Sequence, residues 1–169
     1  MIKELCTLTK MLFQSRPNEI KEVKLMGMDH FPFKGYAYIM WCGKMIYRND
    51  MYDVRRKEWI TKKYKVSKNH ETIHLMQAKT CGSWVKYYWR YFCEWLKGGI
   101  IIAPVSSAYY TIPYEAEAYA NDCNFDYSKN YDGSNLPKYT FKHRKKLYKK
   151  VGGTKKSWIA YIQALNIDD

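Results

Sequence analysis

The sequence predicts an α+β fold, and three features indicate it. Residues 35–47 are rich in aromatic and β-branched side chains around a central glycine, Gly43, which is typical of two strands or a bent hairpin. Residues 83–96 carry aromatic side chains three and four positions apart, which indicates an amphipathic helix. Pro113 precedes an alanine-rich run over residues 114–121, and proline is favoured in the first turn of a helix.

The elements before these helices are assigned from local signals. Residues 1–28 indicate a short opening element followed by a loop around Pro17, and residues 51–66 indicate a connection across the surface. The first long helix is predicted to begin at Ser67, because several cap residues stand there ahead of an apolar pattern. It is predicted to end near Gly82.

The composition describes a single globular domain spanning all 169 residues, since 47% of them are hydrophobic and 27% charged. We expect the core of this domain at about residues 33–122 and a basic C-terminal extension at residues 128–169. Within the extension, turn signals at Gly133 and Gly152 lead to a short apolar helix predicted over residues 158–165.

The sequence also bears on the cellular compartment. No stretch approaches the roughly 18–20 uncharged apolar residues that a membrane span requires. The N-terminal residues lack the continuous apolar core and the small-residue cleavage site of a signal peptide. The five cysteines are scattered and form no CxxC pair, which favours free thiols over a disulfide framework. We therefore expect a protein of the reducing cytoplasm with no membrane span and no signal peptide.

Positive charge is concentrated late in the chain. The formal net charge is +13, and residues 138–156 contain nine Lys or Arg residues and no acid. Such a block either keeps an aromatic-rich protein soluble or forms a surface that binds anions, including nucleic acid held non-specifically through its phosphates. The side chains predicted for that surface are Lys142, Arg144, Lys145, Lys146, Lys149 and Lys150.

The residues most informative about chemistry are HETIH, which run from His70 to His74. Positions four apart lie on the same face of a helix, so both imidazoles can reach one metal ion. Glu71 follows the first histidine, where it can take a proton from a water at the open position of the metal. The motif predicts a metal site with His70 and His74 as ligands and Glu71 as general base.

A third protein ligand has to come from elsewhere in the chain. The residues after His74 read LMQAKTC, which excludes the three-histidine form of the motif, HExxHxxGxxH. Glu115 and Glu117 lie in the predicted third helix, about forty residues later, and acids are otherwise absent between Glu94 and Asp122. The two glutamates are about 200° apart around a helix, so only one of them can face the metal.

HETIH followed by PYEAEAYAN resembles the gluzincin metallopeptidases, whose third ligand is a glutamate on a downstream helix. It also resembles small uncharacterised zincin-like proteins of gut Bacteroidetes and their phages, over about residues 33–121 and including Gln77. The resemblance implies a minimal zincin-like domain, in which a small N-terminal sheet packs on the HExxH helix, beside the aromatic-rich helix and the glutamate-bearing helix. It further implies a zinc-dependent peptidase that hydrolyses peptide bonds.

The same resemblance assigns roles around the metal and leaves one ligand open. Zinc would be held by the two histidines of HETIH and by either Glu115 or Glu117. In gluzincins an acid or amide four residues after the glutamate often orients a metal-bound histidine. Asn121 has that spacing from Glu117, and Tyr119 has it from Glu115, with tyrosine in place of the usual aspartate. The motif alignment favours Glu115.

Three functions are compatible with these observations. The first is a zinc peptidase that acts on a peptide or protein substrate, and the intact Glu71 favours it. The second is a zincin fold kept as a structural or binding subunit of a larger protein assembly, such as a phage particle, for which the many Tyr, Trp and Lys residues would suit an interface. The third is a basic protein associated with nucleic acid.

Overall fold

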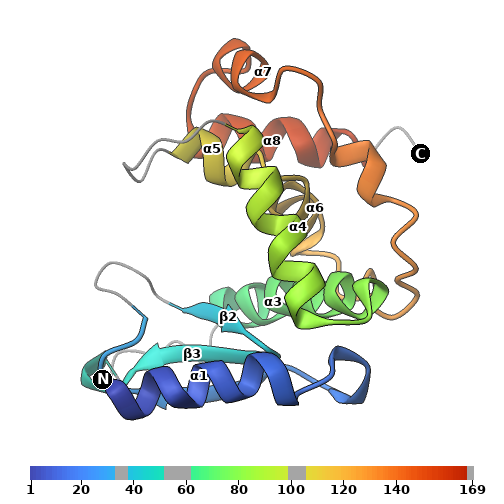
Figure 1. The fold of residues 1–169 in the computed structure, drawn as a ribbon. Helices are drawn as coiled ribbons and strands as arrows, with labels where there is room; N and C mark the ends of the chain where they lie inside the picture. Colours follow the sequence, from blue (N-terminus) through green and yellow to red (C-terminus); the bar gives the residue numbers. More distant parts are fainter. Residues whose placement is uncertain (33–37, 52–61, 99–105, 167–169) are drawn as a thin grey trace.

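The computed structural model describes residues 1–32, 38–51, 62–98 and 106–166, and its fold is α+β, as the sequence predicts (Figure 1). A small sheet flanked by α1 forms the N-terminal part, and further helices follow it. The described helices and strands are α1 (Ile2–Gln14), β1 (Lys24–Met28), β2 (Ile39–Trp41), β3 (Lys44–Arg48), α3 (Lys62–Cys81), α4 (Trp84–Lys97), α5 (Ser106–Tyr110), α6 (Pro113–Asn121), α7 (Arg144–Lys150) and α8 (Lys155–Ala164), with single helical turns η1 (Pro17–Glu19), η2 (Asn49–Met51) and η3 (Leu136–Tyr139).

The sheet has the strand order β1-β3-β2, in which β3 is parallel to β1 and antiparallel to β2. Cys42 and Gly43 join β2 to β3, and their φ angles of 48° and 78° are the left-handed values that a two-residue hairpin turn requires. The predicted hairpin is confirmed over residues 39–47, and residues 35–37 of that prediction lie outside the described residues. The strand β1 was not predicted, because its sequence KLMGM has no β-branched or aromatic residue.

Both faces of the sheet are covered, because neighbouring residues of β3 point to opposite sides. Ile46 packs with Leu8 of α1 on one side. Met45 packs with Leu75 of α3 on the other. The indole N–H of Trp41 also donates a hydrogen bond to the main-chain oxygen of Leu8 at 2.9 Å, which fixes α1 to the sheet. The sheet thus forms a buried support for α3, the helix that carries HETIH.

Helix α3 is longer than the sequence predicts. It begins at Lys62 and not at Ser67, so the residues read as caps lie inside the helix. One of them, Asn69, donates its side-chain amide to the main-chain oxygen of Asp122, just past the end of α6, at 2.8 Å. A polar side chain that finds such a partner does not compete with its own helix. The predicted surface connection is shorter as a result, and its residues 52–61 lie outside the described residues.

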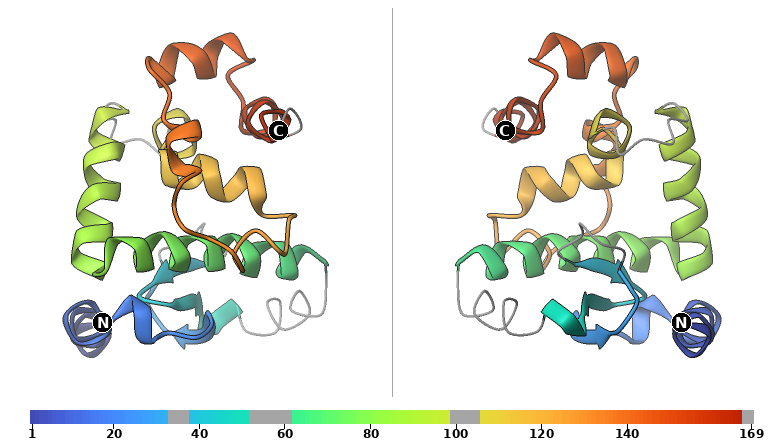
Figure 2. Two further views of the ribbon diagram at one scale, coloured as in Figure 1. Left: turned by 90° about the vertical axis from the view of Figure 1, so that its right-hand side faces the viewer. Right: turned by 90° about the vertical axis from the view of Figure 1, so that its left-hand side faces the viewer.

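The next two helices match their predictions closely. Gly82, with a left-handed φ of 71°, ends α3 as expected. Helix α4 then buries Trp84 and Tyr87 of its aromatic face, and α6 begins at Pro113. Figure 2 shows α4 rising from one end of α3, while α6 lies across α3 in both views.

The basic C-terminal residues are folded onto α6. Ala116 of α6 packs with Tyr139, Tyr148, Trp158 and Ile162 in a second buried cluster. The predicted terminal helix is confirmed as α8, which begins three residues earlier than expected.

Two features bear on the expected compartment. None of the described helices is long and apolar enough to cross a membrane. The five cysteines all fall within the described residues, and all are free thiols.

Candidate metal centre

Two histidines of α3 and one glutamate of α6 meet in the interior. His70 and His74 lie on one face of α3, and their Nε2 atoms are 3.1 Å apart. Glu115 approaches both, with Oε2 3.4 Å from His70 Nε2 and Oε1 3.3 Å from His74 Nε2. The three candidate ligand atoms lie within 4.8 Å of one another, and all three side chains are buried. This group could bind a metal ion.

Local structure explains this convergence. The four-residue spacing puts both imidazoles over adjacent turns of α3. Pro113 begins α6 and places Glu115 in its first turn, directed at α3. Asn69 holds the other end of α6 through its hydrogen bond to the main-chain oxygen of Asp122. Both ends of the short helix are therefore defined relative to the helix that carries the histidines.

The donor set fits a divalent metal ion. Oε2 of Glu115 is buried and makes no hydrogen bond to any described residue. Such an orphaned polar atom calls for a further partner. The two Nε2 atoms face each other across a short distance, although neither can accept a proton from the other while both are neutral lone-pair donors. Two imidazole nitrogens and one carboxylate oxygen form the protein ligand set of His₂Glu zinc sites.

The electrostatics of the group also favour a bound cation. Burial alone would raise the pKa of the Glu115 carboxyl, but the charge of His74 and hydrogen bonds from both histidines hold that pKa well below its usual range. Burial would lower the pKa of His74, yet the neighbouring Glu115 carboxylate raises it to about 9. The carboxylate therefore draws positive charge to the imidazoles, as a proton or as a metal ion.

Two tyrosines of α4 reach the group. The hydroxyl of Tyr91 donates to Oε1 of Glu115 at 2.7 Å, and the hydroxyl of Tyr87 lies 3.2 Å from Nδ1 of His74. The sequence pattern places both residues on the core face of the aromatic helix and does not identify them as part of the site. The available signal was the choice of tyrosine over phenylalanine, because a buried tyrosine hydroxyl needs a hydrogen-bond partner.

Glu117, the alternative metal ligand, has different surroundings. It is 0% exposed. Its carboxylate accepts hydrogen bonds from Gln77 Nε2 at 2.7 Å, from the Tyr127 hydroxyl at 2.8 Å and from the Tyr131 hydroxyl at 2.9 Å. Burial raises the pKa of Glu117 against the opposing effect of these donors. The structure therefore gathers Glu115 with the two histidines and gives Glu117 three hydrogen-bond donors.

Tyr119 and Asn121, the residues expected to orient a histidine, lie on α6 in separate settings. The ring of Tyr119 packs against that of His70, with centroids 4.4 Å apart. The amide of Asn121 donates to the main-chain oxygen of Glu117 at 2.8 Å and to the Tyr139 hydroxyl at 3.0 Å. Tyr119 thus contacts a histidine of the group, whereas Asn121 connects α6 to the C-terminal residues.

Glu71 is half-buried beside the group. Burial raises the pKa of its carboxyl, while the charges of His70 and His74 act in the opposite direction. The carboxyl therefore lies within the electrostatic field of both histidines. Its assignment as general base remains a prediction from the motif.

The side chains predicted to form an anion surface divide into one buried residue and five exposed ones. Arg144 is only 7% exposed and donates to Glu94 Oε2 at 3.2 Å and to the main-chain oxygen of Thr111 at 3.3 Å. We therefore assign Arg144 to the packing of α7 against α4. The exposed side chains are Lys142, Lys145, Lys146, Lys149 and Lys150.

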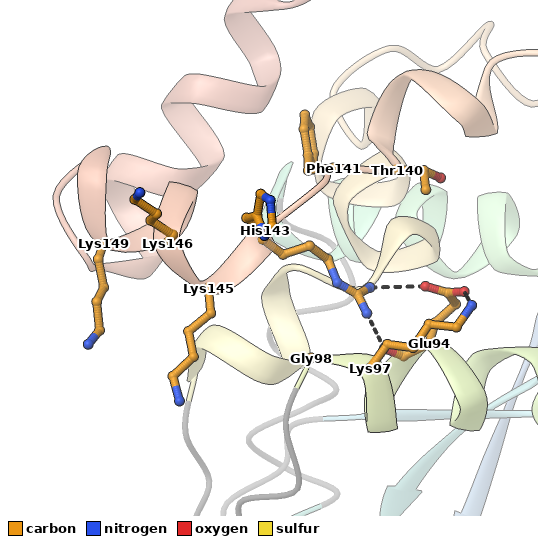
Figure 3. A pocket seen from close by; sticks show the side chains of 10 residues that line it. Glu94, Lys97, Gly98, Thr140, Phe141, His143, Lys145, Lys146 and Lys149 are labelled. Carbon is orange, nitrogen blue, oxygen red and sulfur yellow. Dashed lines mark hydrogen bonds and ion pairs between the residues drawn. The ribbon is translucent and has the colours of Figure 1, made fainter.

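Some of these lysines border a surface cavity of about 770 Å³ between the end of α4 and α7. His143 and Lys97 also line it. Figure 3 shows that Lys145, Lys146 and Lys149 extend from α7 on the side away from Glu94. The cavity is therefore bordered by several cationic side chains.

Comparison with known proteins adds no assignment: no family model, no curated protein and no solved structure matches this chain. The functional argument accordingly rests on the residues and their geometry.

Proposed function

We propose that this protein is a zinc-dependent hydrolase of peptide bonds, with zinc held by His70, His74 and Glu115. The observation that carries the proposal is the meeting of these three buried side chains at the HETIH motif, with an orphaned carboxylate oxygen among them. The resemblance of HETIH and PYEAEAYAN to gluzincins supplies the reaction class.

A bound zinc ion would supply Lewis acidity, lowering the pKa of water at its open position to near 7 and polarising the substrate carbonyl. Glu71 would accept a proton from the attacking water and deliver it to the leaving amine as the peptide C–N bond breaks. The buried hydrogen bond from Tyr91 would hold the Glu115 carboxylate in place for metal binding.

Glu71→Gln is the variant that tests this reaction. It removes the base and keeps the size of the side chain, so we expect zinc content to be unchanged and peptide hydrolysis to fall by at least about 10²-fold. Hydrolysis is followed with a quenched fluorescent peptide library, and His74→Ala is the control that loses both zinc and activity. Wild-type hydrolysis by Glu71→Gln, or loss of zinc from it, would contradict the assigned role.

A second candidate function, binding of nucleic acid, is favoured by the exposed lysines around the cavity beside α7. Binding would be through phosphates and would weaken steeply with salt. We expect charge reversal of Lys145, Lys146 and Lys149 to weaken binding of a labelled oligonucleotide between 50 and 200 mM salt, by the rule that each phosphate contact adds about 0.9 to the salt slope. Reversal of the exposed Lys3, Lys10 and Lys21 is the matched control, and equal loss in both variants would contradict a specific surface.

A further inference from the structure

Gln77 connects the candidate metal centre to the buried Glu117. Its Oε1 lies 2.7 Å from Nδ1 of His74. Its Nε2 donates to Oε2 of Glu117 at 2.7 Å and to the main-chain oxygen of Tyr114 at 2.9 Å. Gln77 is only 1% exposed, so these hydrogen bonds form in the interior, where water does not compete for them.

The partners of Gln77 determine which way its amide points. The main-chain oxygen of Tyr114 can only accept a hydrogen bond, so the atom of Gln77 that faces it must be the NH₂ group. The same group faces the Glu117 carboxylate. Oε1 is then the atom that faces His74, and it can only accept. Nδ1 of His74 must therefore carry a proton, and the Nε2 lone pair of the neutral ring is left for a metal ion.

Glu117 is what makes this orientation strongly preferred. A carboxylate attracts an NH₂ group and repels a carbonyl oxygen, so a reversed amide of Gln77 would place two acceptors against each other. Glu117 is in turn fixed by the hydroxyls of Tyr127 and Tyr131, which belong to the segment after α6. The conformation of that segment is thereby linked to the orientation of His74.

We propose that Glu117 is a positioning residue of the metal centre, acting through Gln77 to hold His74 with its Nε2 directed at the metal. The inference rests on the metal site of the proposed function. It assigns the second glutamate of PYEAEAYAN a role distinct from that of the ligand Glu115. Partners that orient a metal-bound histidine and raise its basicity typically contribute 10- to 100-fold to metal affinity.

A purely structural role for Glu117 makes a different expectation. Loss of a buried hydrogen-bonded group would then lower the stability of the metal-free protein and leave the metal affinity of the folded protein unchanged. Tyr139 offers a matched control, because its hydroxyl is also buried and hydrogen-bonded, to Asn121 and Asn166, and makes no contact in the Glu117–Gln77–His74 chain.

The experiment measures zinc affinity by competition with a chromophoric chelator for the wild type, Glu117→Gln, Gln77→Leu and Tyr139→Phe. Thermal unfolding of each protein with a chelator present reports stability without metal. The Nδ1 proton of His74, followed by NMR in the zinc-loaded protein, reports its hydrogen bond directly. We expect zinc affinity to fall about 10- to 100-fold in Glu117→Gln and Gln77→Leu, with a displaced Nδ1 proton resonance, and to be unchanged in Tyr139→Phe.

The outcomes separate this inference from the proposed function. Wild-type zinc affinity and an unmoved His74 resonance in Glu117→Gln and Gln77→Leu overturn the positioning role and leave the hydrolase intact. Weakened zinc binding in both variants, with no hydrolysis by any protein, supports the positioning role and overturns the hydrolase. Failure of the wild type to bind zinc any better than His74→Ala overturns both.

Discussion

The side-chain amide of Asn69 on α3 donates to the main-chain oxygen of Asp122 at 2.8 Å and also lies 3.0 Å from that of Asn124. The last carbonyl groups of a helix have no partner within the helix, and Asn69 supplies one at the end of α6. Because Asn69 precedes His70, one short stretch of α3 both presents a histidine and holds the helix that carries Glu115.

Asn69→Ala is expected to destabilise the protein, because it leaves buried carbonyl oxygens without a donor. The cost expected for such a loss is about 1–3 kcal/mol in the free energy of unfolding, measured by chemical denaturation without metal. Lys65→Ala, at an exposed position of the same helix, is the control and should have little effect. Equal stability of Asn69→Ala and the wild type would show that this contact does not hold α6.

Tyr91→Phe removes only the hydroxyl that donates to Glu115 Oε1. We expect zinc affinity to fall about 10-fold, because the ligand carboxylate is no longer held in place. Tyr88→Phe is the matched control on the same helix, since its hydroxyl accepts a hydrogen bond from the main chain of Cys42. If both variants bind zinc equally well, Tyr91 does not support the metal site.

Arg144→Met is expected to act on stability and not on binding of anions. It removes the partner of Glu94 and the donor to the Thr111 main-chain oxygen, and loss of one member of a largely buried ion pair costs about 3 kcal/mol. The exposed Lys145→Met should change the free energy of unfolding by less than about 0.5 kcal/mol. The prediction fails if the two variants unfold at the same denaturant concentration.

Zinc itself is expected to stabilise the folded protein, because the three ligands come together only on folding. At a free zinc concentration 100 times the dissociation constant, the added stability is about 2.7 kcal/mol. A rise in melting temperature on adding zinc, reversed by a chelator and absent in His74→Ala, is the expected observation. An identical rise in His74→Ala would place the zinc at another site.

The sequence predicts the parts of this site that depend on local spacing. The helix period alone brings His70 and His74 to one face, and Pro113 marks the start of the helix that carries the glutamates. The choice between Glu115 and Glu117 depends on how α6 rotates against α3, which local spacing does not determine. The motif alignment nevertheless favoured Glu115, the glutamate that the structure places beside both histidines.

Other features depend on tertiary contacts and were beyond the sequence. The start of α3 at Lys62 was missed because Asn69 resembles a cap residue, and only the position of α6 reveals its actual partner. Arg144 is hidden in a run of exposed lysines, and its burial follows from Glu94, fifty residues earlier. The hydroxyl of Tyr91 becomes part of the site only once α4 and α6 are packed together.

The central claim is that His70, His74 and Glu115 hold one zinc ion, and native mass spectrometry of the purified protein tests it most directly. The sample is prepared without added metal, beside His74→Ala purified in the same way. We expect one zinc ion per wild-type chain and none in the variant. A wild-type chain without metal, or equal zinc in His74→Ala, would contradict the claim.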